Sequence, residues 1–170
     1  PGDPVVIVYL VGMPGSGKST VGAELAGRLG VPFIDLDVEI ERAEGRSVTD
    51  IFAAEGEAGF RALEAKALVA ASAHDPAVIA CGGGVVLEPA NRITLRNTGT
   101  CVYVDVPLEV LEARVQPDAD RPLIRSHGDI PRLLEVRGPL YREFAAHVVD
   151  GEGDPGDVAD AIVEELRWSA

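Results

Sequence analysis

The glycine-rich segment 12–19, GMPGSGKS, combines residue types that suit the binding of phosphate groups. It has the form G-x4-G-K-S and directly follows an apolar run at 5–11. Its glycines let backbone N–H groups approach an anion closely, and the start of a following helix adds the positive end of a dipole. Lys18 adds a full charge near the β- and γ-phosphates, and the Ser19 hydroxyl can ligate Mg²⁺. The segment therefore predicts a P-loop that binds a nucleoside triphosphate, with a ligand-free glycine turn as the alternative.

Two carboxylates, Asp35 and Asp37, lie at the end of a short predicted strand at 33–35. Side chains two residues apart on an extended chain point to the same face. Beside a P-loop, one carboxylate could hold Mg²⁺ through water, and the other could accept a proton from an acceptor hydroxyl. The alternative interpretation is that Asp37 only caps the helix that follows.

Arg61 and the glycine triplet 82–84 each allow a functional and a structural interpretation. Arg61 has Glu57 and Glu64 at i−4 and i+3. This spacing is typical of an ion-pair ladder on the surface of a helix, and spacing alone favours that reading. The triplet could be a tight turn, or its N–H groups could approach a carboxylate or a phosphate.

Arginines gather in the second half of a chain that is otherwise acidic. Arg121, in the polar stretch 116–130, could close over ATP and stabilise the charge on the transferring oxygens, with a solvated loop charge as the alternative. Guanidinium groups also suit the bidentate capture of a carboxylate. The arginines concerned are Arg114, Arg121, Arg125, Arg132 and Arg137.

These candidate residues need elements that bring them together, and strands alternate with helices along the chain. This alternation predicts an α/β fold with a parallel sheet and helices on both faces. We expect strands at about 5–11, 33–35, 77–80, 100–105 and 147–149, and helices at about 18–29, 38–44, 48–54, 57–73, 89–96, from 107, 130–145 and from 155. Ligands of such sheets lie beyond the carboxyl ends of the strands, where the P-loop, the two carboxylates and the triplet all stand.

Length and composition limit the class of protein. The 170 residues predict one domain, and the net charge of −13 argues against nucleic acid or an anionic membrane as a partner. No apolar run has the length of a membrane span and the start of the sequence lacks a signal-like pattern, so we expect a cytoplasmic protein. Cys81 and Cys101 show no metal-binding spacing, and we expect both to be reduced and buried.

Six pieces of the sequence occur together in one order: GMPGSGKST, DLD, GRSVTDIFAAEGEAGFRALE, CGGGVV, RPL and RGPLYRE. Over nearly its whole length the chain resembles the shikimate kinases, P-loop kinases of the nucleoside monophosphate kinase-like fold. The resemblance implies a three-layer αβα sandwich around a five-stranded parallel sheet. It also implies one kinase domain at 1–170, with a substrate-binding helical segment at about 37–64 and a lid loop at about 116–130.

The same resemblance implies an activity. A shikimate kinase transfers the γ-phosphate of ATP to the 3-hydroxyl of shikimate, giving shikimate 3-phosphate and ADP in the biosynthesis of chorismate and aromatic amino acids. It implies Mg²⁺ as the metal, ATP and shikimate as the partners, and a monomer. Carried over motif by motif, the implied catalytic residues are Lys18, Asp37 and Arg121; the nucleotide-binding residues are Gly15, Ser16, Gly17, Lys18, Ser19, Thr20, Arg114 and Arg121; the shikimate-binding residues are Asp37, Arg61, Gly82, Gly83, Gly84 and Arg137; and the residues that serve the metal are Ser19 and Asp35.

The resemblance changes the interpretation of Arg61 from a surface ion pair to a ligand of the shikimate carboxylate. Glu57 and Glu64 then become the residues that orient it. One departure is the segment 150–154, DGEGD, which lacks the basic residue that similar kinases can supply to adenine. Two other functions stay open: a kinase for another small polyol or acid such as gluconate, and a nucleotide-binding regulatory domain without turnover.

Overall fold

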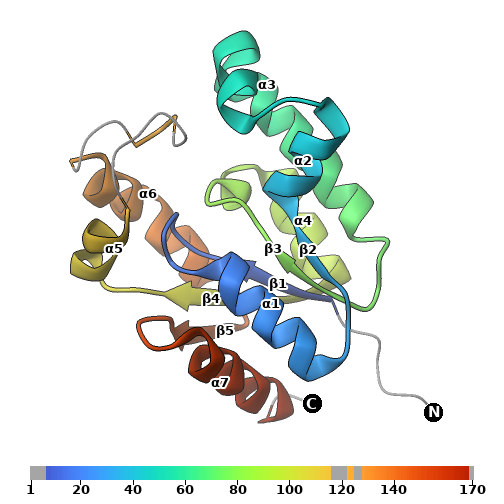
Figure 1. The fold of residues 1–170 in the computed structure, drawn as a ribbon, viewed down its shortest axis with the longest axis vertical. Helices are drawn as coiled ribbons and strands as arrows, with labels where there is room; N and C mark the ends of the chain where they lie inside the picture. The colour runs from blue at the N-terminus through green and yellow to red at the C-terminus, as the bar shows by residue number, and fades with distance from the viewer. Residues whose placement is uncertain (1–6, 116–121, 125–127, 169–170) are drawn as a thin grey trace.

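A five-stranded parallel sheet forms the centre of the molecule in this computed structural model, which describes residues 7–115, 122–124 and 128–168 (Figure 1). The strands are β1 (Ile7–Val11), β2 (Phe33–Asp35), β3 (Ala77–Ala80), β4 (Gly99–Asp105) and β5 (His147–Asp150), in the order β2-β3-β1-β4-β5. β1 pairs with β3 on one side and with β4 on the other. The predicted five-stranded parallel sheet is confirmed.

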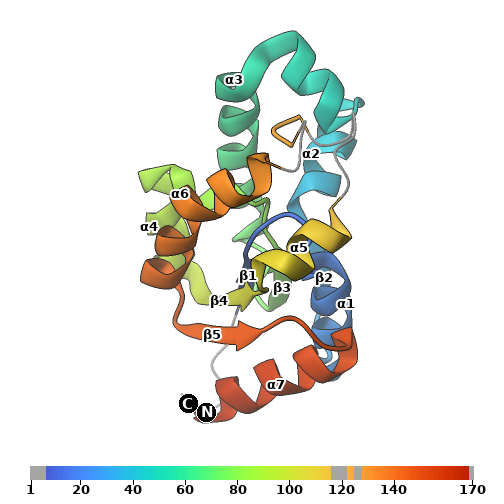
Figure 2. The same cartoon turned by 90° about the vertical axis from the view of Figure 1, so that its left-hand side faces the viewer.

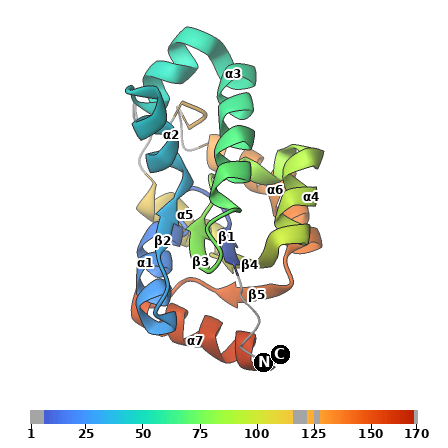
Figure 3. The ribbon, with the colours of Figure 1, turned by 90° about the vertical axis from the view of Figure 1, so that its right-hand side faces the viewer.

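Helices cover both faces of this sheet. They are α1 (Lys18–Leu29), α2 (Leu36–Glu44), α3 (Val48–Ala71), α4 (Pro89–Thr98), α5 (Leu108–Arg114), α6 (Asp129–Phe144) and α7 (Pro155–Trp168), with a short 3₁₀ helix η1 (Val85–Leu87). Figures 2 and 3 show α1 and α7 on one side of the sheet and α4 and α6 on the other, which makes three layers. Within the described residues, none of these helices combines the length and apolarity needed to cross a membrane.

The two central strands β1 and β3 are buried along their whole length. A strand covered by helices on both faces has to be apolar at every position rather than at every second one. The runs IVYLV and AVIA meet this demand, and Tyr9 and Leu10 are completely buried. Cys81 and Cys101 are buried free thiols, as predicted.

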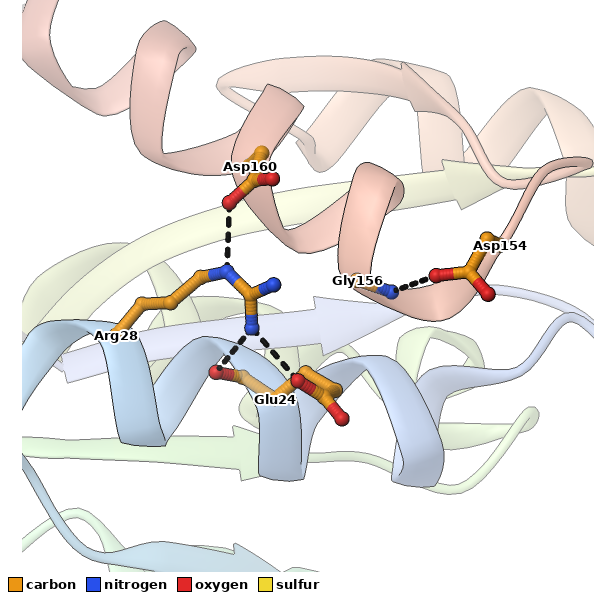
Figure 4. Close-up of polar contacts among 5 residues, drawn as sticks. All are labelled: Glu24, Arg28, Asp154, Gly156 and Asp160. Carbon is orange, nitrogen blue, oxygen red and sulfur yellow. Dashed lines mark hydrogen bonds and ion pairs between the residues drawn. The ribbon is translucent and has the colours of Figure 1, made fainter.

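The helix after the P-loop, α1, is fixed to the last helix, α7. Nε of Arg28 donates to Asp160 of α7 at 2.6 Å, and its Nη1 donates to the Glu24 carboxylate at 2.7 Å (Figure 4). At the start of α7, the Asp154 side chain accepts from the N–H of Gly156 at 2.8 Å, which caps the helix. The first half of α7 is therefore held close to α1, the helix that follows the P-loop.

The α2–α3 pair rises beyond the sheet at the top of Figure 1. Gly45 ends α2 in the left-handed conformation, with φ at 68°, and the Ser47 side chain caps α3. The two helices expected at 48–54 and 57–73 are one element that ends at Ala71, interrupted by non-helical torsion angles at Gly56. Its first half thus lies beyond the sheet, while its second half packs beside it.

Several predicted boundaries need small corrections. Pro107 is the cap of α5 rather than its first residue, and α6 begins at Asp129, so the loop expected at 116–130 ends before that residue. α4 continues to Thr98, two residues beyond the expected end. α2 begins at Leu36 rather than at about 38, so Asp37 lies in the first turn of this helix. The other candidate residues that the structure describes stay after the strand or on the helix to which the sequence assigned them.

Candidate active site

A cavity of about 410 Å³ opens at the carboxyl edge of the sheet. Its wall combines the P-loop and the start of α1, the end of β2, both halves of α3, the glycine triplet after β3, and α6. The predicted site residues that line it are Gly15, Gly17, Lys18, Ser19, Thr20, Asp35, Asp37, Arg61, Gly82, Gly83, Gly84 and Arg137. Residues from the ends of the three strands β1, β2 and β3 therefore meet in one place, as the parallel topology requires.

The P-loop folds around the Lys18 ammonium group. Gly15 and Gly17 have φ values of 85° and 88°, a backbone conformation that only glycine adopts without strain. Nζ of Lys18 donates to the carbonyl oxygens of Gly12 and Met13 at 2.7 and 2.9 Å. Burial lowers the pKa of Lys18 to about 8, and the nearby Asp37 carboxylate opposes this shift. Ser16 lies buried beneath the loop, 3.5 Å from the same ammonium group.

Asp35 links the P-loop helix to α2. One of its oxygens accepts from the Ser19 hydroxyl at 2.6 Å. Its other oxygen accepts from the N–H groups of Asp37 and Val38 at 3.0 and 3.3 Å, so Asp35 is the N-cap of α2. The alternative interpretation, in which Asp37 caps this helix, is therefore wrong.

The carboxyl group of Asp37 points into the cavity wall and is not used for capping. Its Oδ1 is buried and has no hydrogen-bond partner among the described residues. Burial raises the pKa of this carboxyl group and the neighbouring Asp35 raises it further, while Lys18 and Arg61 oppose the shift. A buried carboxylate oxygen without a donor is costly, which makes it a natural acceptor for a hydroxyl group of a ligand.

Arg61 pairs with Glu64 inside the wall of the cavity. Its Nη1 donates to the Glu64 carboxylate at 3.0 Å, and the two side chains are 11% and 0% exposed. Glu57 stays on the exposed side of the helix. The surface ladder favoured by spacing alone is thus wrong, and of the two expected orienting acids only Glu64 contacts Arg61. Arg61 Nε and Glu64 Oε2 are buried without hydrogen-bond partners in the described part of the chain.

The glycine triplet has no room for side chains. A Cβ at Gly84 would lie 2.4 Å from the Arg61 guanidinium group, and one at Gly82 would lie 2.7 Å from Glu64 Oε2. At Gly83 a Cβ would lie 3.0 Å from Nη1 of Arg137. The triplet is therefore a surface of bare backbone packed against two arginines.

Arg137 reaches the cavity from α6 and is only 3% exposed. On the same helix, the hydroxyl of Tyr141 donates a hydrogen bond to the carbonyl oxygen of Gly83. Sequence reasoning placed Tyr141 in a motif but gave it no role. The available signal was its position four residues after Arg137, because residues so spaced share one face of a helix.

Arg114 stands beside the P-loop rather than in the cavity wall. Its guanidinium group donates to the carbonyl oxygens of Gly15 at 3.3 Å and Glu152 at 3.0 Å. It thus connects the P-loop to the segment 150–154, which lacks a basic residue of its own. Arg121 lies outside the described residues.

Apolar side chains complete the cavity, and the sequence did not single them out as part of a site. They come from α3, from α6 and from the segment 122–124, and include Val48, Phe52, Phe60, Leu123, Ile124 and Leu133. Phe52 and Phe60 pack together with ring centroids 4.8 Å apart. Helical spacing alone cannot separate such residues from ordinary core positions.

The arrangement joins two kinds of binding surface in one cavity. One surface offers the N–H groups and the lysine of a P-loop, which suit a triphosphate. The second surface offers a carboxylate, two arginines and bare backbone, and apolar side chains line the same cavity. A small acid that also carries hydroxyl groups would fit this second surface and would lie next to the phosphates.

The chain has close relatives among known proteins. A family model described as shikimate kinase matches residues 14–167. A curated shikimate kinase from Halorhodospira halophila is 47% identical over 164 residues, which cover 94% of this chain and 93% of the relative. The structure of a shikimate kinase from Acinetobacter baumannii in complex with shikimate superimposes with a TM-score of 0.93 at 37% identity, covering 97% of this chain and 94% of that one.

The alternative function, a kinase that acts on gluconate, has less support from the comparisons than a shikimate kinase has. A gluconokinase structure from Sinorhizobium meliloti covers 97% of each chain with a TM-score of 0.56 but is only 17% identical, so the likeness extends to the fold alone. The family model and the full-length relatives agree with the ordered motifs and with the cavity that those motifs build. The chain belongs to the shikimate kinase family, and it is an ATP-dependent kinase that transfers phosphate to shikimate.

Proposed function

We propose that this enzyme binds ATP on the P-loop and shikimate on the opposite wall of the same cavity, and transfers the γ-phosphate to the 3-hydroxyl. One observation carries the proposal: the cavity that contains the P-loop also contains buried polar atoms without partners among the described residues. These are Asp37 Oδ1, Arg61 Nε and Glu64 Oε2. A ligand with hydroxyl groups and a carboxylate supplies the donors and acceptors that Asp37 and Arg61 need.

The carboxylate of shikimate is assigned to Arg61, Arg137 and the backbone of Gly82, Gly83 and Gly84. Both guanidinium groups lie against the triplet, and a planar carboxylate can accept two parallel hydrogen bonds from such a group. Glu64 is buried beside Arg61 and keeps its guanidinium group in place. This pairing also limits the cost of burying an arginine inside the cavity wall.

Asp37 is assigned to the reacting hydroxyl group, first as a hydrogen-bond acceptor and then as the base. Its raised pKa makes it a stronger base than an exposed aspartate, since a base works best when its pKa approaches the working pH. Taking the proton as the oxygen attacks leaves a neutral ester oxygen on the product. Because phosphoryl transfer depends mainly on position and electrostatics, holding the hydroxyl in line with the phosphate is the larger part of this role.

The phosphates are assigned to the P-loop residues Gly15, Ser16, Gly17, Lys18, Ser19 and Thr20. Lys18 donates one of its hydrogen bonds to the phosphate oxygens and balances the charge that they gain. Arg121 is proposed to share this task, an assignment that rests on the family motif because the residue lies outside the described residues. Arg114, held between Gly15 and Glu152, is assigned to the adenine side of the nucleotide.

The residues beside the P-loop suit Mg²⁺. Ser19 and Asp35 offer a hydroxyl and a carboxylate that already lie 2.6 Å apart, and hard oxygen donors of this kind are what Mg²⁺ prefers. The described residues contain no group of three or more His, Cys, Asp and Glu that could hold a metal by themselves, which agrees with an ion bound mainly by phosphates and water. When bound, Mg²⁺ would withdraw charge from the phosphate oxygens.

Several broader assignments follow as part of the proposal. We infer one kinase domain over 1–170, a substrate-binding segment at 37–64 and a lid that closes from the segment between α5 and α6. We also infer a monomer in the cytoplasm that acts in the biosynthesis of chorismate and aromatic amino acids. The net charge of −13 supports the prediction that nucleic acid and anionic membranes are not partners.

The proposal is tested by ADP release from the purified enzyme with ATP and Mg²⁺, in the presence of shikimate, of gluconate or of neither. We expect release that depends on shikimate alone. Asp37→Asn should lower kcat by about 10²–10⁴, the usual contribution of a general base, and leave ATP binding intact. Asp157→Asn, the same change on the exposed side of α7, should leave kcat unchanged. Full kcat in Asp37→Asn would remove the assigned base.

A further inference from the structure

The peptide between Gly83 and Gly84 is held from outside the cavity by a tyrosine. The hydroxyl group of Tyr141, a residue with no exposed surface, donates to the carbonyl oxygen of Gly83. Tyr141 lies four residues after Arg137 on α6, and the Arg137 Nη1 atom lies 3.0 Å from the position of a Cβ at Gly83. One face of α6 therefore presents a guanidinium group and a hydroxyl group to the same glycine.

Fixing this carbonyl group also fixes the direction of an N–H group. In a planar trans peptide the C=O and N–H bonds point in opposite directions, so the N–H of Gly84 points away from Tyr141. Peptides flanked by glycines turn over at low cost, because no Cβ restricts φ. A triplet of glycines thus needs outside contacts if its N–H groups are to keep one direction.

A second contact holds the same loop two peptides further along the chain. The side-chain amide of Asn91, which is 2% exposed, donates to the carbonyl oxygen of Val85 at 3.1 Å. Tyr141 from α6 and Asn91 from α4 therefore anchor carbonyl groups on either side of Gly84. Both anchors are buried side chains on elements outside the substrate-binding segment.

Packing does not explain the hydroxyl group of Tyr141. Its ring packs on Tyr103 with centroids 5.1 Å apart and planes tilted by 32°, a contact that phenylalanine would preserve. Burial raises the pKa of Tyr141 to about 12, against the opposing effect of the Arg137 guanidinium group beside it. The hydroxyl group therefore stays protonated, and stays a donor, at neutral pH.

We propose that Tyr141 is a positioning residue that sets the affinity for shikimate by holding the Gly83–Gly84 peptide in the direction that binds the substrate carboxylate. This inference rests on the proposed function, in which the triplet, Arg61 and Arg137 hold that carboxylate. The residue does not touch the reacting atoms. Its loss should weaken the binding of shikimate and leave phosphoryl transfer in the saturated enzyme unchanged.

The test is steady-state kinetics of Tyr141→Phe. We expect the KM for shikimate to rise about three- to tenfold, the loss that corresponds to one ordinary hydrogen bond, with kcat and the KM for ATP unchanged. Tyr103→Phe is the matched control, because it removes a buried hydroxyl group from the neighbouring ring, which contacts Asp105 instead of the triplet. This control should leave the KM for shikimate unchanged.

Arg61→Ala, measured alongside, distinguishes a failure of the role of Tyr141 from a failure of the proposed shikimate site. A raised KM for shikimate in Arg61→Ala with an unchanged KM in Tyr141→Phe would overturn the role of Tyr141 and leave the proposed binding site standing. An unchanged KM in both variants would contradict the proposed site itself. A lower kcat together with a higher KM for both shikimate and ATP in Tyr141→Phe, with a lowered Tm, would show that the tyrosine serves only the stability of the fold. This result would also overturn the inference.

Discussion

At the scale of single residues, cationic and acidic side chains pair with one another in the site. A few of their polar atoms are left to pair with a ligand. Three cationic and three acidic side chains line the cavity: Lys18, Arg61, Arg137, Asp35, Asp37 and Glu64. Each charge that is removed from water needs a partner, which explains why the cations lie among carboxylates. The pairing is incomplete at Asp37, Arg61 and Glu64, each of which has a buried polar atom without a partner among the described residues. Under the proposed function, Asp37 and Arg61 are where the enzyme discriminates between acids that carry hydroxyl groups and acids that do not.

Gly84 offers a residue-scale test of the carboxylate site. Its φ is −96°, so alanine would meet no left-handed strain, but the new Cβ would lie 2.4 Å from the Arg61 guanidinium group. Since the end of an arginine can move, Gly84→Ala should displace Arg61 and cost little stability. We expect the KM for shikimate to rise by about tenfold or more, as for a lost hydrogen bond to a charged group, with Tm almost unchanged.

The control for this variant is Gly138→Ala on α6, where the added Cβ would make only an ordinary contact with Leu134 at 3.5 Å. It should leave the KM for shikimate unchanged. An equal effect of the two variants, or none in Gly84→Ala, would mean that Arg61 does not hold the carboxylate from its position against the triplet.

Lys18 offers a second residue-scale test, through pH. Burial lowers its pKa to about 8 in the free enzyme, so the ammonium group that attracts phosphates is lost as the pH rises through that value. Bound phosphates favour the ammonium form and raise this pKa again. We therefore expect kcat/KM for ATP to fall progressively above about pH 8, while kcat at saturating ATP stays level over the same range. A kcat/KM for ATP that stays constant up to about pH 9.5 would be inconsistent with a depressed Lys18 pKa.

At the scale of elements, both halves of α3 bring side chains to the cavity because a glycine interrupts the helix. Gly56 has φ 72° and ψ −176°, and the two halves of the helix run in different directions on either side of it. The first half brings Val48 and Phe52 to the cavity, while the second half brings Phe60, Arg61 and Glu64. The proposed substrate-binding segment therefore depends on a backbone conformation that only glycine adopts easily.

Gly56→Ala tests this element. A Cβ there would meet nothing within 4 Å, so any cost comes from the torsion angles alone. We expect a loss of about 1–3 kcal/mol in the free energy of unfolding, measured by urea denaturation. Gly27→Ala is the matched control: its Cβ is equally free of contacts, but it lies within regular α1, where alanine should stabilise by about 0.5–1 kcal/mol. Equal effects of the two changes would contradict the strain assigned to Gly56.

The elements also show what a sequence can and cannot predict. Buried strands such as IVYLV and AVIA can be predicted from their unbroken apolar runs. The P-loop can be predicted from its glycines and lysine. Whether Glu57 or Glu64 contacts Arg61 depends on which side of α3 faces the glycine triplet, and both are at helical spacing. Likewise, Asp35 and Asp37 are equivalent on an extended chain until the exact start of α2 makes Asp35 the cap.

At the scale of the whole molecule, the order of the strands creates the site. Because β1 lies between β3 and β4, the P-loop after β1 stands beside the glycine triplet after β3, although about 70 residues separate them in sequence. The arginine from α6 comes from still further along the chain. Motif order in the sequence identifies the participants, but only the three-dimensional fold brings Arg137 and Tyr141, which share one face of α6, to Gly83. The contact between Tyr141 and Gly83 could not be predicted for this reason.

The distribution of charge also belongs to this scale. The chain has a net charge of −13, yet three cations converge on one cavity. An acidic surface keeps large polyanions away, while a local group of cations still binds small anions that enter the cavity. The cavity is therefore suited to small anionic substrates.

The central claim is that one cavity holds shikimate by its carboxylate, with a hydroxyl group turned toward the P-loop. A crystal structure of the enzyme with ADP, Mg²⁺ and shikimate tests it most directly. The account predicts the carboxylate within hydrogen-bond distance of Arg61, Arg137 and the backbone of the glycine triplet, and the 3-hydroxyl against the carboxylate of Asp37, facing the phosphates. A shikimate molecule whose carboxylate lies away from both arginines, or whose hydroxyl groups do not contact Asp37, would contradict it.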